Sequence, residues 1–314
     1  MKINYIKQCT KEIALEIKYD LLIGASGYEK RGSYFFSHYN PISESKICLG
    51  FKNNKEGSRE INDLIFQRNH FNIIEVNNNS TNDIIKILND ELSQHSGKEE
   101  LRILVDFSCM STLMYASIFK YFNDVNQYKR VTIYFSYTQS VYSKPKNRSP
   151  LKHHSPITIL NNIELTDKKI ALIIGLGYDR DKALGLYEYF QNDLTDMYLF
   201  MTSDNIFSKD VLANNLELIS KLSENNIIKY DISNISYLIS TLDSLVTYLL
   251  NNNFRVVISP TGPKIFALAS LIIGMYHKNV SIYRSSMGDT DDIVDKEADI
   301  NKEIIITEVN FTND

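Results

Sequence analysis

Two short segments carry hydroxyl groups directly after an apolar run. Residues 106–111 read DFSCMS after LRILV, and residues 259–264 read SPTGPK after FRVVI; an apolar run with helical character follows each of them. A turn that leads from a strand into a helix presents backbone N–H groups and the positive end of the helix dipole, and both attract anions. Hydroxyl donors and one positive charge are available in these turns: Ser108, Ser111, Thr261 and Lys264. The sequence therefore predicts that the turns hold a phosphate group.

A glycine turn precedes each of these segments in the chain. YDLLIGASGYEKR and IALIIGLGYDRDK align by the triplets Gly27-Tyr28-Glu29 and Gly177-Tyr178-Asp179. In a doubly wound sheet the ligand binds outside the carboxyl ends of the strands, where the strand order reverses, so we expect each glycine turn to meet a hydroxyl turn there. Further candidates for ligand contact lie in or beside these turns: Gly27, Tyr28, Gly177, Tyr178, Arg180, Gly262 and Arg284.

Each candidate also has a purely structural interpretation. Serine and threonine at these places cap helices, and the glycines allow a tight turn and close packing. Glu29 and Asp179 are the candidates for a catalytic acid or base, but a carboxylate in the first turn of a helix also stabilises the helix dipole. The chain contains no complete GxGxxG fingerprint, no GxSxG elbow and no HExxH motif, and we expect no metal and no cofactor.

The two halves of the chain repeat one pattern. NIIEVN (72–77) matches NIIKYD (226–231), VTIYFSYT (131–138) matches VSIYRSSM (280–287), and the spacing from Gly27 to Ser108 is nearly that from Gly177 to Thr261. Short apolar strands alternate with helical segments in both halves, which is typical of parallel sheets covered on both faces. The sequence predicts an α/β protein of two tandem doubly wound Rossmann-like domains with parallel sheets, related by internal duplication.

The predicted domains are 1–142 and 168–314, joined by a proline-rich basic linker, 143–167. We interpret the linker as a solvated connection. The alternative is a basic arm that docks on a phosphate ligand or on a partner. The acidic tail and the strand-like run EIIITEVNF (303–311) are assigned to the second domain, where that run is expected at a sheet edge; the opening segment, 1–18, is also a candidate edge strand.

Composition restricts the class of protein. The 314 residues are 43% hydrophobic and 23% charged, which is a globular composition. A net charge of −4 argues against duplex nucleic acid as the main partner. Three cysteines without a CxxC pair, no apolar run long enough to span a bilayer and no signal peptide lead us to expect a cytoplasmic protein without a membrane partner. The oligomeric state stays open, with a homo-oligomer among the options.

The segments ISPTGPKIFALASLII (258–273) and LRILVDFSCMSTLMYASI (101–118) resemble the last strand-to-helix signature of the CRISPR-associated Rossmann fold. This is the CARF and SAVED group of cyclic-oligonucleotide sensors. The matching positions are Thr261, Gly262 and Lys264, whereas Ser108 matches Thr261 only; Ser111 stands where a lysine is expected, and Pro263 departs from the pattern. The resemblance implies that paired lobes bind a cyclic oligonucleotide in bacterial antiviral defence. The output would then come from a separate effector protein or from cleavage of the messenger itself.

Three functions are therefore compatible with the sequence. The first is a two-lobed sensor that binds a nucleotide or cyclic oligonucleotide, and it is favoured because one symmetric ligand could meet both turns. The second is a nucleotide-processing hydrolase or transferase that uses the same cleft. The third is a scaffold whose second lobe has lost any ligand and which only binds a partner protein; filled, apolar strand ends in both lobes would favour it.

Overall fold

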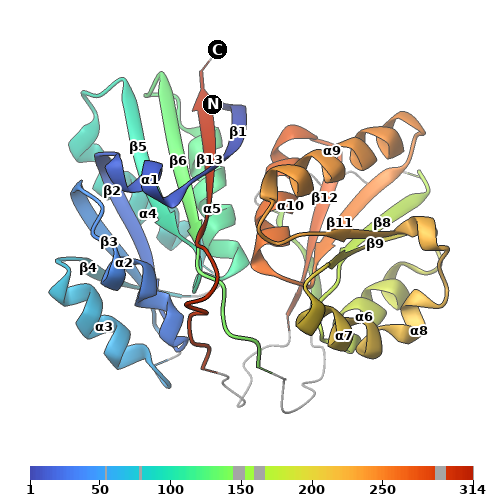
Figure 1. Cartoon of the computed structure of the whole chain (residues 1–314). Helices are drawn as coiled ribbons and strands as arrows, with labels where there is room; N and C mark the ends of the chain where they lie inside the picture. Colours follow the sequence, from blue (N-terminus) through green and yellow to red (C-terminus); the bar gives the residue numbers. More distant parts are fainter. Residues whose placement is uncertain (54, 78–79, 144–152, 159–166, 287–294, 314) are drawn as a thin grey trace. The chain divides into compact units, whose positions relative to one another are not determined.

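The computed structural model describes residues 1–314 except 54, 78–79, 144–152, 159–166, 287–294 and 314. The chain forms two compact units (Figure 1). Unit 1 comprises Met1–Ser143 with Ile293–Asp314, and unit 2 comprises Lys144–Asp292. Unit 2 is thus inserted into the chain of unit 1, and each unit has its own sheet.

Unit 1 is built on a sheet in the order β1-β13-β6-β5-β2-β3-β4. The strands from β4 to β6 are parallel, and β13 and β1 continue the sheet antiparallel. Its strands are β1 (Lys2–Cys9), β2 (Tyr19–Ser26), β3 (Ser43–Phe51), β4 (Asn72–Val76), β5 (Glu100–Asp106), β6 (Arg130–Tyr137) and β13 (Ile305–Thr312). Its helices are α1 (Lys11–Glu16), η1 (Lys30–Ser33), α2 (Tyr34–His38), α3 (Arg59–Arg68), α4 (Thr81–Leu92), η2 (Ser93–His95) and α5 (Thr112–Asp124).

Unit 2 is built on a sheet in the order β10-β9-β8-β11-β12-β7, in which only β7 is antiparallel. Its strands are β7 (His153–Pro156), β8 (Ile170–Gly175), β9 (Leu194–Thr202), β10 (Ile227–Tyr230), β11 (Arg255–Pro260) and β12 (Val280–Ser286). Its helices are α6 (Arg180–Phe190), α7 (Asn205–Asn214), α8 (Leu216–Ile219), η4 (Glu224–Asn226), α9 (Ile235–Asn251) and α10 (Lys264–Tyr276).

The parallel strands have the same order in both units. The first strand, β2 or β8, lies between the second and the fourth, and the third and fifth flank them. This is the arrangement of a doubly wound fold, and it places the reversal of strand order between β2 and β5 and between β8 and β11. The predicted α/β fold of two similar Rossmann-like sheets is confirmed, and the four repeated sequence anchors fall on equivalent strands and turns.

The antiparallel strands correct the predicted domain boundaries. The C-terminal run forms β13, which pairs with β6 and β1 and so belongs to the interior of the unit 1 sheet rather than to an edge of the second domain. The opening segment forms β1, an edge strand as expected. Within the predicted linker, His153–Pro156 form β7 beside β12; residues 144–152 and 159–166 lie outside the described part. Local sequence could not assign β13, because a strand finds its sheet through distant partners.

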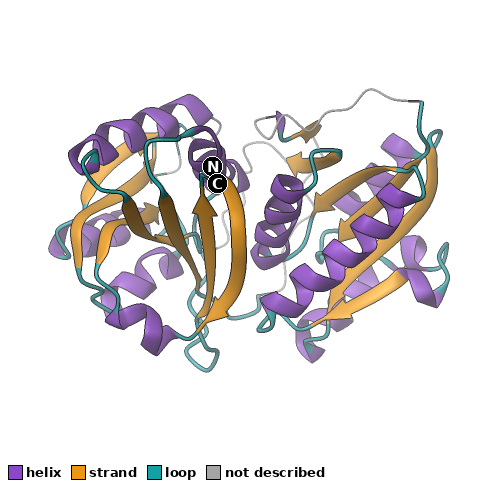
Figure 2. Ribbon diagram, turned by 90° about the horizontal axis from the view of Figure 1, so that it is seen from above, coloured by secondary structure: helices purple, strands orange, loops and turns teal. Residues whose placement is uncertain are grey.

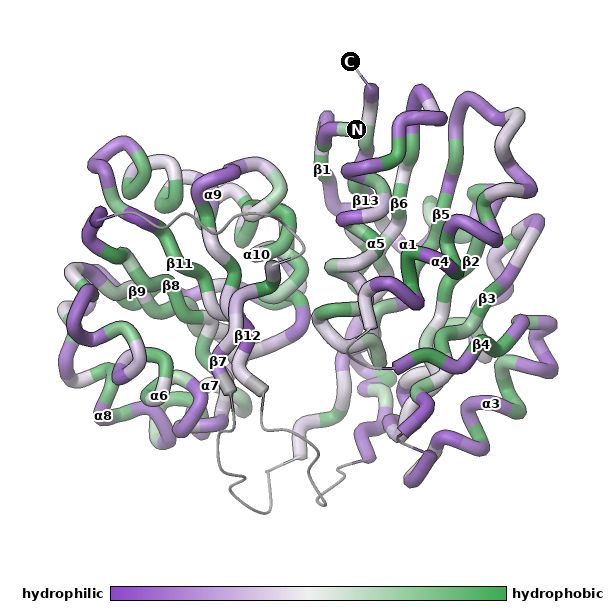
Figure 3. The backbone as a smooth tube through the Cα atoms, turned by 180° about the vertical axis from the view of Figure 1, so that it is seen from behind, coloured by the Kyte–Doolittle hydropathy of each residue, from purple (hydrophilic) through white to green (hydrophobic). Residues whose placement is uncertain are grey.

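Helices cover both faces of each sheet, as Figure 2 shows from above. In unit 2, Leu172 and Ile174 of β8 pack with residues of α6 and β9 in one core cluster. On the opposite face, a Cβ at Gly175 would meet the ring of Phe266 in α10 at 2.2 Å. The apolar residues follow the central strands (Figure 3), because a strand buried on both faces cannot alternate with polar residues. No helix in the described residues is both long and apolar enough to cross a bilayer.

Candidate functional site

In unit 2 the glycine turn and the hydroxyl turn lie in backbone contact. A Cβ on Gly177 would come within 2.4 Å of the carbonyl oxygen of Thr261, and a Cβ on Gly262 within 2.4 Å of the carbonyl oxygen of Leu176. Thr261 adds two hydrogen bonds, since its N–H and its hydroxyl both donate to the Gly175 carbonyl, at 3.0 and 2.8 Å. The predicted meeting of the two turns is therefore observed, and both glycines are required by space.

The hydroxyl turn of unit 2 is partly open to solvent. Residues 260–264 are all partly exposed, and α10 begins at Lys264. A positively polarised helix end and a lysine therefore lie together at an accessible sheet edge. Thr261 already donates its hydroxyl hydrogen and its N–H to the Gly175 carbonyl. Its side chain therefore shapes the turn and has no further hydrogen to donate to a ligand.

Arg284 extends this edge. Tyr283 packs in the core cluster on the α6 face of the sheet, and side chains alternate along a strand, so the neighbouring Arg284 emerges on the α10 face. The register pairs Ile258 with Ile282, which places Arg284 beside Pro260 at the carboxyl end of β11. Partial burial lowers the pKa of the guanidinium, although arginine stays protonated at neutral pH. Lys264 and Arg284 thus both lie at the carboxyl edge of the unit 2 sheet, on the face that α10 covers.

The remaining unit 2 candidates line the glycine turn. Tyr178 is partly buried against Phe207, with ring centroids 5.6 Å apart in a T-shaped arrangement, so its ring stabilises the turn. Asp179 precedes α6 and forms an ion pair with Lys182 at 3.4 Å. Arg180 is the first residue of α6, and its side chain lies outside the described part of the structure.

In unit 1 the equivalent turns also meet, but through side chains. A Cβ on Gly27 would meet the Phe51 ring at 2.5 Å and the Cys109 sulfur at 2.9 Å, and a Cβ on Gly32 would meet the Cys109 Cβ at 3.1 Å. Cys109 is buried where unit 2 has Gly262. The cysteine therefore packs the junction between the two turns.

The predicted hydroxyl contacts of unit 1 are internal. Ser108 is fully buried, and its hydroxyl donates to the Asp106 carboxylate while it accepts the N–H of Thr138 at 2.8 Å. These bonds join the end of β5 to the residue after β6. Ser111 is partly exposed at the N-cap of α5. The position of Ser108 thus fits the structural alternative, because its hydroxyl cannot reach a ligand outside the unit.

Glu29, a candidate acid or base, forms a buried ion pair with Arg31. The Glu29 carboxylate accepts Nε–H of Arg31 at 2.7 Å, and the two side chains are 9% and 3% exposed. Arg31 also donates to the carbonyl of Thr138 at 3.0 Å and lies over the ring of Tyr137. Burial by itself lowers the pKa of this guanidinium, but Glu29 and Tyr137 outweigh that effect and raise the pKa. This pair ties the glycine turn to the end of β6.

Sequence reasoning missed the acidic segment that covers the unit 1 turn. Lys30 donates its N–H to the Asp295 carboxylate at 2.7 Å, and the Ser58 hydroxyl donates to the same carboxylate at 2.5 Å. The carbonyl of Lys296 accepts the N–H of Arg31 at 3.0 Å. The acidic composition of the tail was visible in the sequence, but its target 265 residues away along the chain was not.

A buried asparagine repeated in both units was also missed. Asn62 of α3 donates to the carbonyls of Gly27 and Glu29 at 3.0 and 2.9 Å. Asn215, between α7 and α8, donates to the carbonyl of Gly177 at 2.9 Å. Each asparagine thus fixes the glycine turn from the helical segment that follows the second strand. The helices align poorly by sequence, so only the matching positions of the two side chains could have indicated the pair.

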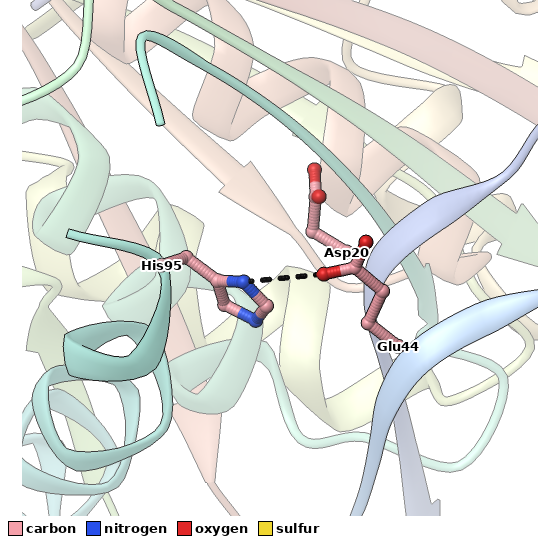
Figure 4. Close-up of side chains that lie close together, drawn as sticks. All are labelled: Asp20, Glu44 and His95. Carbon is pink, nitrogen blue, oxygen red and sulfur yellow. Dashed lines mark ion pairs between the residues drawn. The ribbon is translucent and has the colours of Figure 1, made fainter. Parts of the chain in front are cut away.

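A third group of polar residues lies at the opposite, amino-terminal edge of the unit 1 sheet. Asp20, Glu44 and His95 offer atoms close enough to suggest a cation site (Figure 4), with His95 Nδ1 at 3.6 Å from Glu44. Lys98 already provides the cation, since its ammonium lies 2.5 Å from Asp20 and 2.6 Å from Glu44. This cluster is an ion-pair network and gives no reason to revise the expectation of a site without metal.

No known family model matches the chain, and no curated protein sequence matches it either.

Proposed function

We propose that unit 2 binds a phosphate-containing nucleotide at the carboxyl edge of its sheet and that the protein acts as a nucleotide sensor. The resemblance of residues 258–273 to cyclic-oligonucleotide sensors extends the proposal to a cyclic oligonucleotide as the ligand and to antiviral defence as the setting. A separate effector protein would then read the bound state.

One observation supports this proposal above the others. Lys264 and Arg284 belong to one face of the edge at which the glycine turn and the N-terminus of α10 meet, and the turn between them is partly exposed. A phosphate group is held in proteins by such a combination of helix N-terminus, lysine and arginine. The third hypothesis, a scaffold, would be favoured by filled strand ends in both units, and the partial exposure of residues 260–264 gives it no such support.

The enzyme hypothesis receives less support from the geometry. Glu29 is engaged by Arg31 in the interior of unit 1, and a general base must reach its substrate. Asp179 is partly exposed but is paired with Lys182. Sensing therefore fits the described residues better than catalysis does.

The test uses the full-length protein and a panel of ATP, linear dinucleotides and cyclic di-, tri- and tetranucleotides. Native mass spectrometry detects binding, and thermal shifts rank it. We expect Lys264→Ala and Arg284→Met each to weaken binding by about tenfold, the contribution of one charge-assisted contact. Lys278→Ala is the matched control, because Lys278 is an exposed lysine just beyond the other end of α10.

The outcomes separate the hypotheses. Binding that both site variants lose and the control retains would support the sensor. Recovery of a cleaved ligand would support the nucleotide-processing enzyme in place of the sensor. If no member of the panel binds, or if Lys278→Ala weakens binding as much as Lys264→Ala does, the site proposed in unit 2 is wrong.

A further inference from the structure

The two chain segments that connect the units are held together on unit 1. The outgoing segment after β6 and the returning segment before β13 form an isolated antiparallel bridge between Ser140 and Ala298. Around it, Val141 donates its N–H to the carbonyl of Glu297 at 3.0 Å, and Asp299 donates its N–H to the carbonyl of Gln139 at 2.9 Å. Such a short pairing is marginal by itself, because two isolated strands bury little apolar surface.

The pairing is anchored by the returning segment. Asp295 accepts hydrogen bonds from the N–H of Lys30 and the hydroxyl of Ser58. Lys296 accepts from the N–H of Arg31, and Glu297 forms an ion pair with the Lys30 ammonium at 2.7 Å. The last pair is 57% and 63% exposed and contributes little, so the carboxylate of Asp295 is the principal anchor.

The groups that bind Asp295 are held in place by a tight turn. Gly57 has a φ of +61°, and its chain neighbour Ser58 donates its N–H to the carbonyl of Tyr28 at 3.0 Å. This turn delivers the Ser58 hydroxyl to the same place as the N–H of Lys30. Hydrogen bonds to an ionised carboxylate are about twice as strong as neutral ones, so this small set of contacts can decide whether the segment stays docked.

We propose that residues 139–141 and 295–299 form a latch, locked by Asp295, that controls how freely the two units move relative to each other. Both connections pass through it because unit 2 is inserted between β6 and β13. Release of Asp295 therefore loosens both connections at once. The latch is a conformational device of the chain itself and does not depend on the identity of any ligand.

The first experiment is hydrogen exchange of the full-length protein with Asp295→Ala. The N–H of Lys30 loses its acceptor directly, so its faster exchange is expected for any role of Asp295. The informative amides are those of Val141 and Asp299, whose acceptors the substitution leaves in place. We expect them to exchange about tenfold faster or more, as for the loss of one charged hydrogen bond.

The matched control is Asp299→Ala, which removes a carboxylate from the same segment. The Asp299 carboxylate accepts the local N–H of Asn301 at 3.1 Å. We expect this variant to leave the Val141 amide unchanged. Asp295→Asn keeps one acceptor oxygen and is expected to give an intermediate rate, which guards against a folding defect in the alanine variant.

The second experiment measures the distance between the units by paired spin labels. Labels at Glu60→Cys and Ser236→Cys occupy exposed positions on α3 and α9, while the three native cysteines are buried. We expect Asp295→Ala to broaden the distance distribution and Asp299→Ala to leave it unchanged. Unchanged exchange at Val141 and Asp299, or faster exchange with an unchanged distance distribution, would overturn the latch.

Discussion

The carboxyl edges of the two sheets have the same framework and different surfaces. In unit 1 the glycine turn is covered by the chain's own residues 295–297 and tied inward by the pair of Glu29 and Arg31. In unit 2 the equivalent edge is partly exposed at residues 260–264. The comparison teaches that two units with the same strand order keep the same turns because packing demands them, whereas residues outside the shared pattern set the accessibility of each turn.

The shared part of the framework rests on contacts that tolerate few substitutions. Gly27 and Gly177 occupy places where a side chain would collide, and Asn62 and Asn215 bind their carbonyls. The difference between the asparagines is local. Ser33 donates to Asn62 Oδ1 at 2.6 Å, whereas Asn215 Oδ1 is buried without a hydrogen-bond partner, and the residue aligned with Ser33 is Ala183.

The largest predicted difference between the units concerns the acidic residue of the glycine turn. Glu29→Gln leaves the guanidinium of Arg31 buried without its anion, so we expect the free energy of unfolding of unit 1 to fall by about 4 kcal/mol. Asp179→Asn breaks a partly exposed pair in unit 2, and we expect a change of about 0–1 kcal/mol. Hydrogen exchange resolved by unit measures both. Equal effects would contradict the distinction between a closed and an open edge.

The next prediction concerns the junction of the turns. Gly262→Ala places a methyl group against the carbonyl of Leu176, and we expect the free energy of unfolding of unit 2 to fall by about 3 kcal/mol because backbone cannot move aside cheaply. Cys109→Ala, at the equivalent place in unit 1, removes only one buried sulfur and is expected to cost about 1 kcal/mol. Denaturant unfolding followed by hydrogen exchange in each unit measures both losses of stability. A larger loss for Cys109→Ala than for Gly262→Ala would refute the steric argument.

The repeated asparagines provide a smaller contrast. Asn62→Ala removes two carbonyl contacts and the acceptor of Ser33, and we expect it to lower the free energy of unfolding by about 2 kcal/mol. Asn215→Ala should lower the free energy of unfolding by about 1 kcal/mol, because the side-chain oxygen of Asn215 already lacks a hydrogen-bond partner. Ala183→Ser sharpens the test, since a new hydroxyl can donate to that oxygen and stabilise unit 2. No gain from Ala183→Ser would show that the two turns are not equivalent at this position.

The smallest predicted effect is a pH dependence of the antiparallel strand of unit 2. Burial lowers the pKa of His154 in β7, so the folded state binds its proton less readily than the unfolded state does. The corresponding stability is present above the unfolded pKa of about 6.5 and is lost as pH falls through the lowered folded value. Exchange of the β7 amides at pH 7.5 and 5.5 should therefore show weaker protection at the lower pH. His154→Gln should remove this dependence, and a variant that retains it would exclude His154 as the cause.

Much of the fold was predictable because it depends on local patterns. Continuous apolar runs identified the parallel strands, and the repeated order of strands and turns identified two similar sheets. The contact between the glycine turn and the hydroxyl turn followed from the strand order of a doubly wound sheet. The burial of Ser108 and the ion pair of Glu29 could not be predicted from the sequence. A serine or a glutamate at a strand end gives the same sequence pattern whether its side chain is buried or exposed.

By itself, the sequence determined the two similar sets of parallel strands and the edge at which their turns meet, because hydrophobic periodicity and glycine positions act over short distances along the chain. Only the tertiary structure decided that β13 belongs to unit 1, that Asp295 covers one turn and that the other is partly exposed. Those features are contacts between residues far apart in the chain. Their energies depend on which groups the folded sheets bring together, and no local pattern records that.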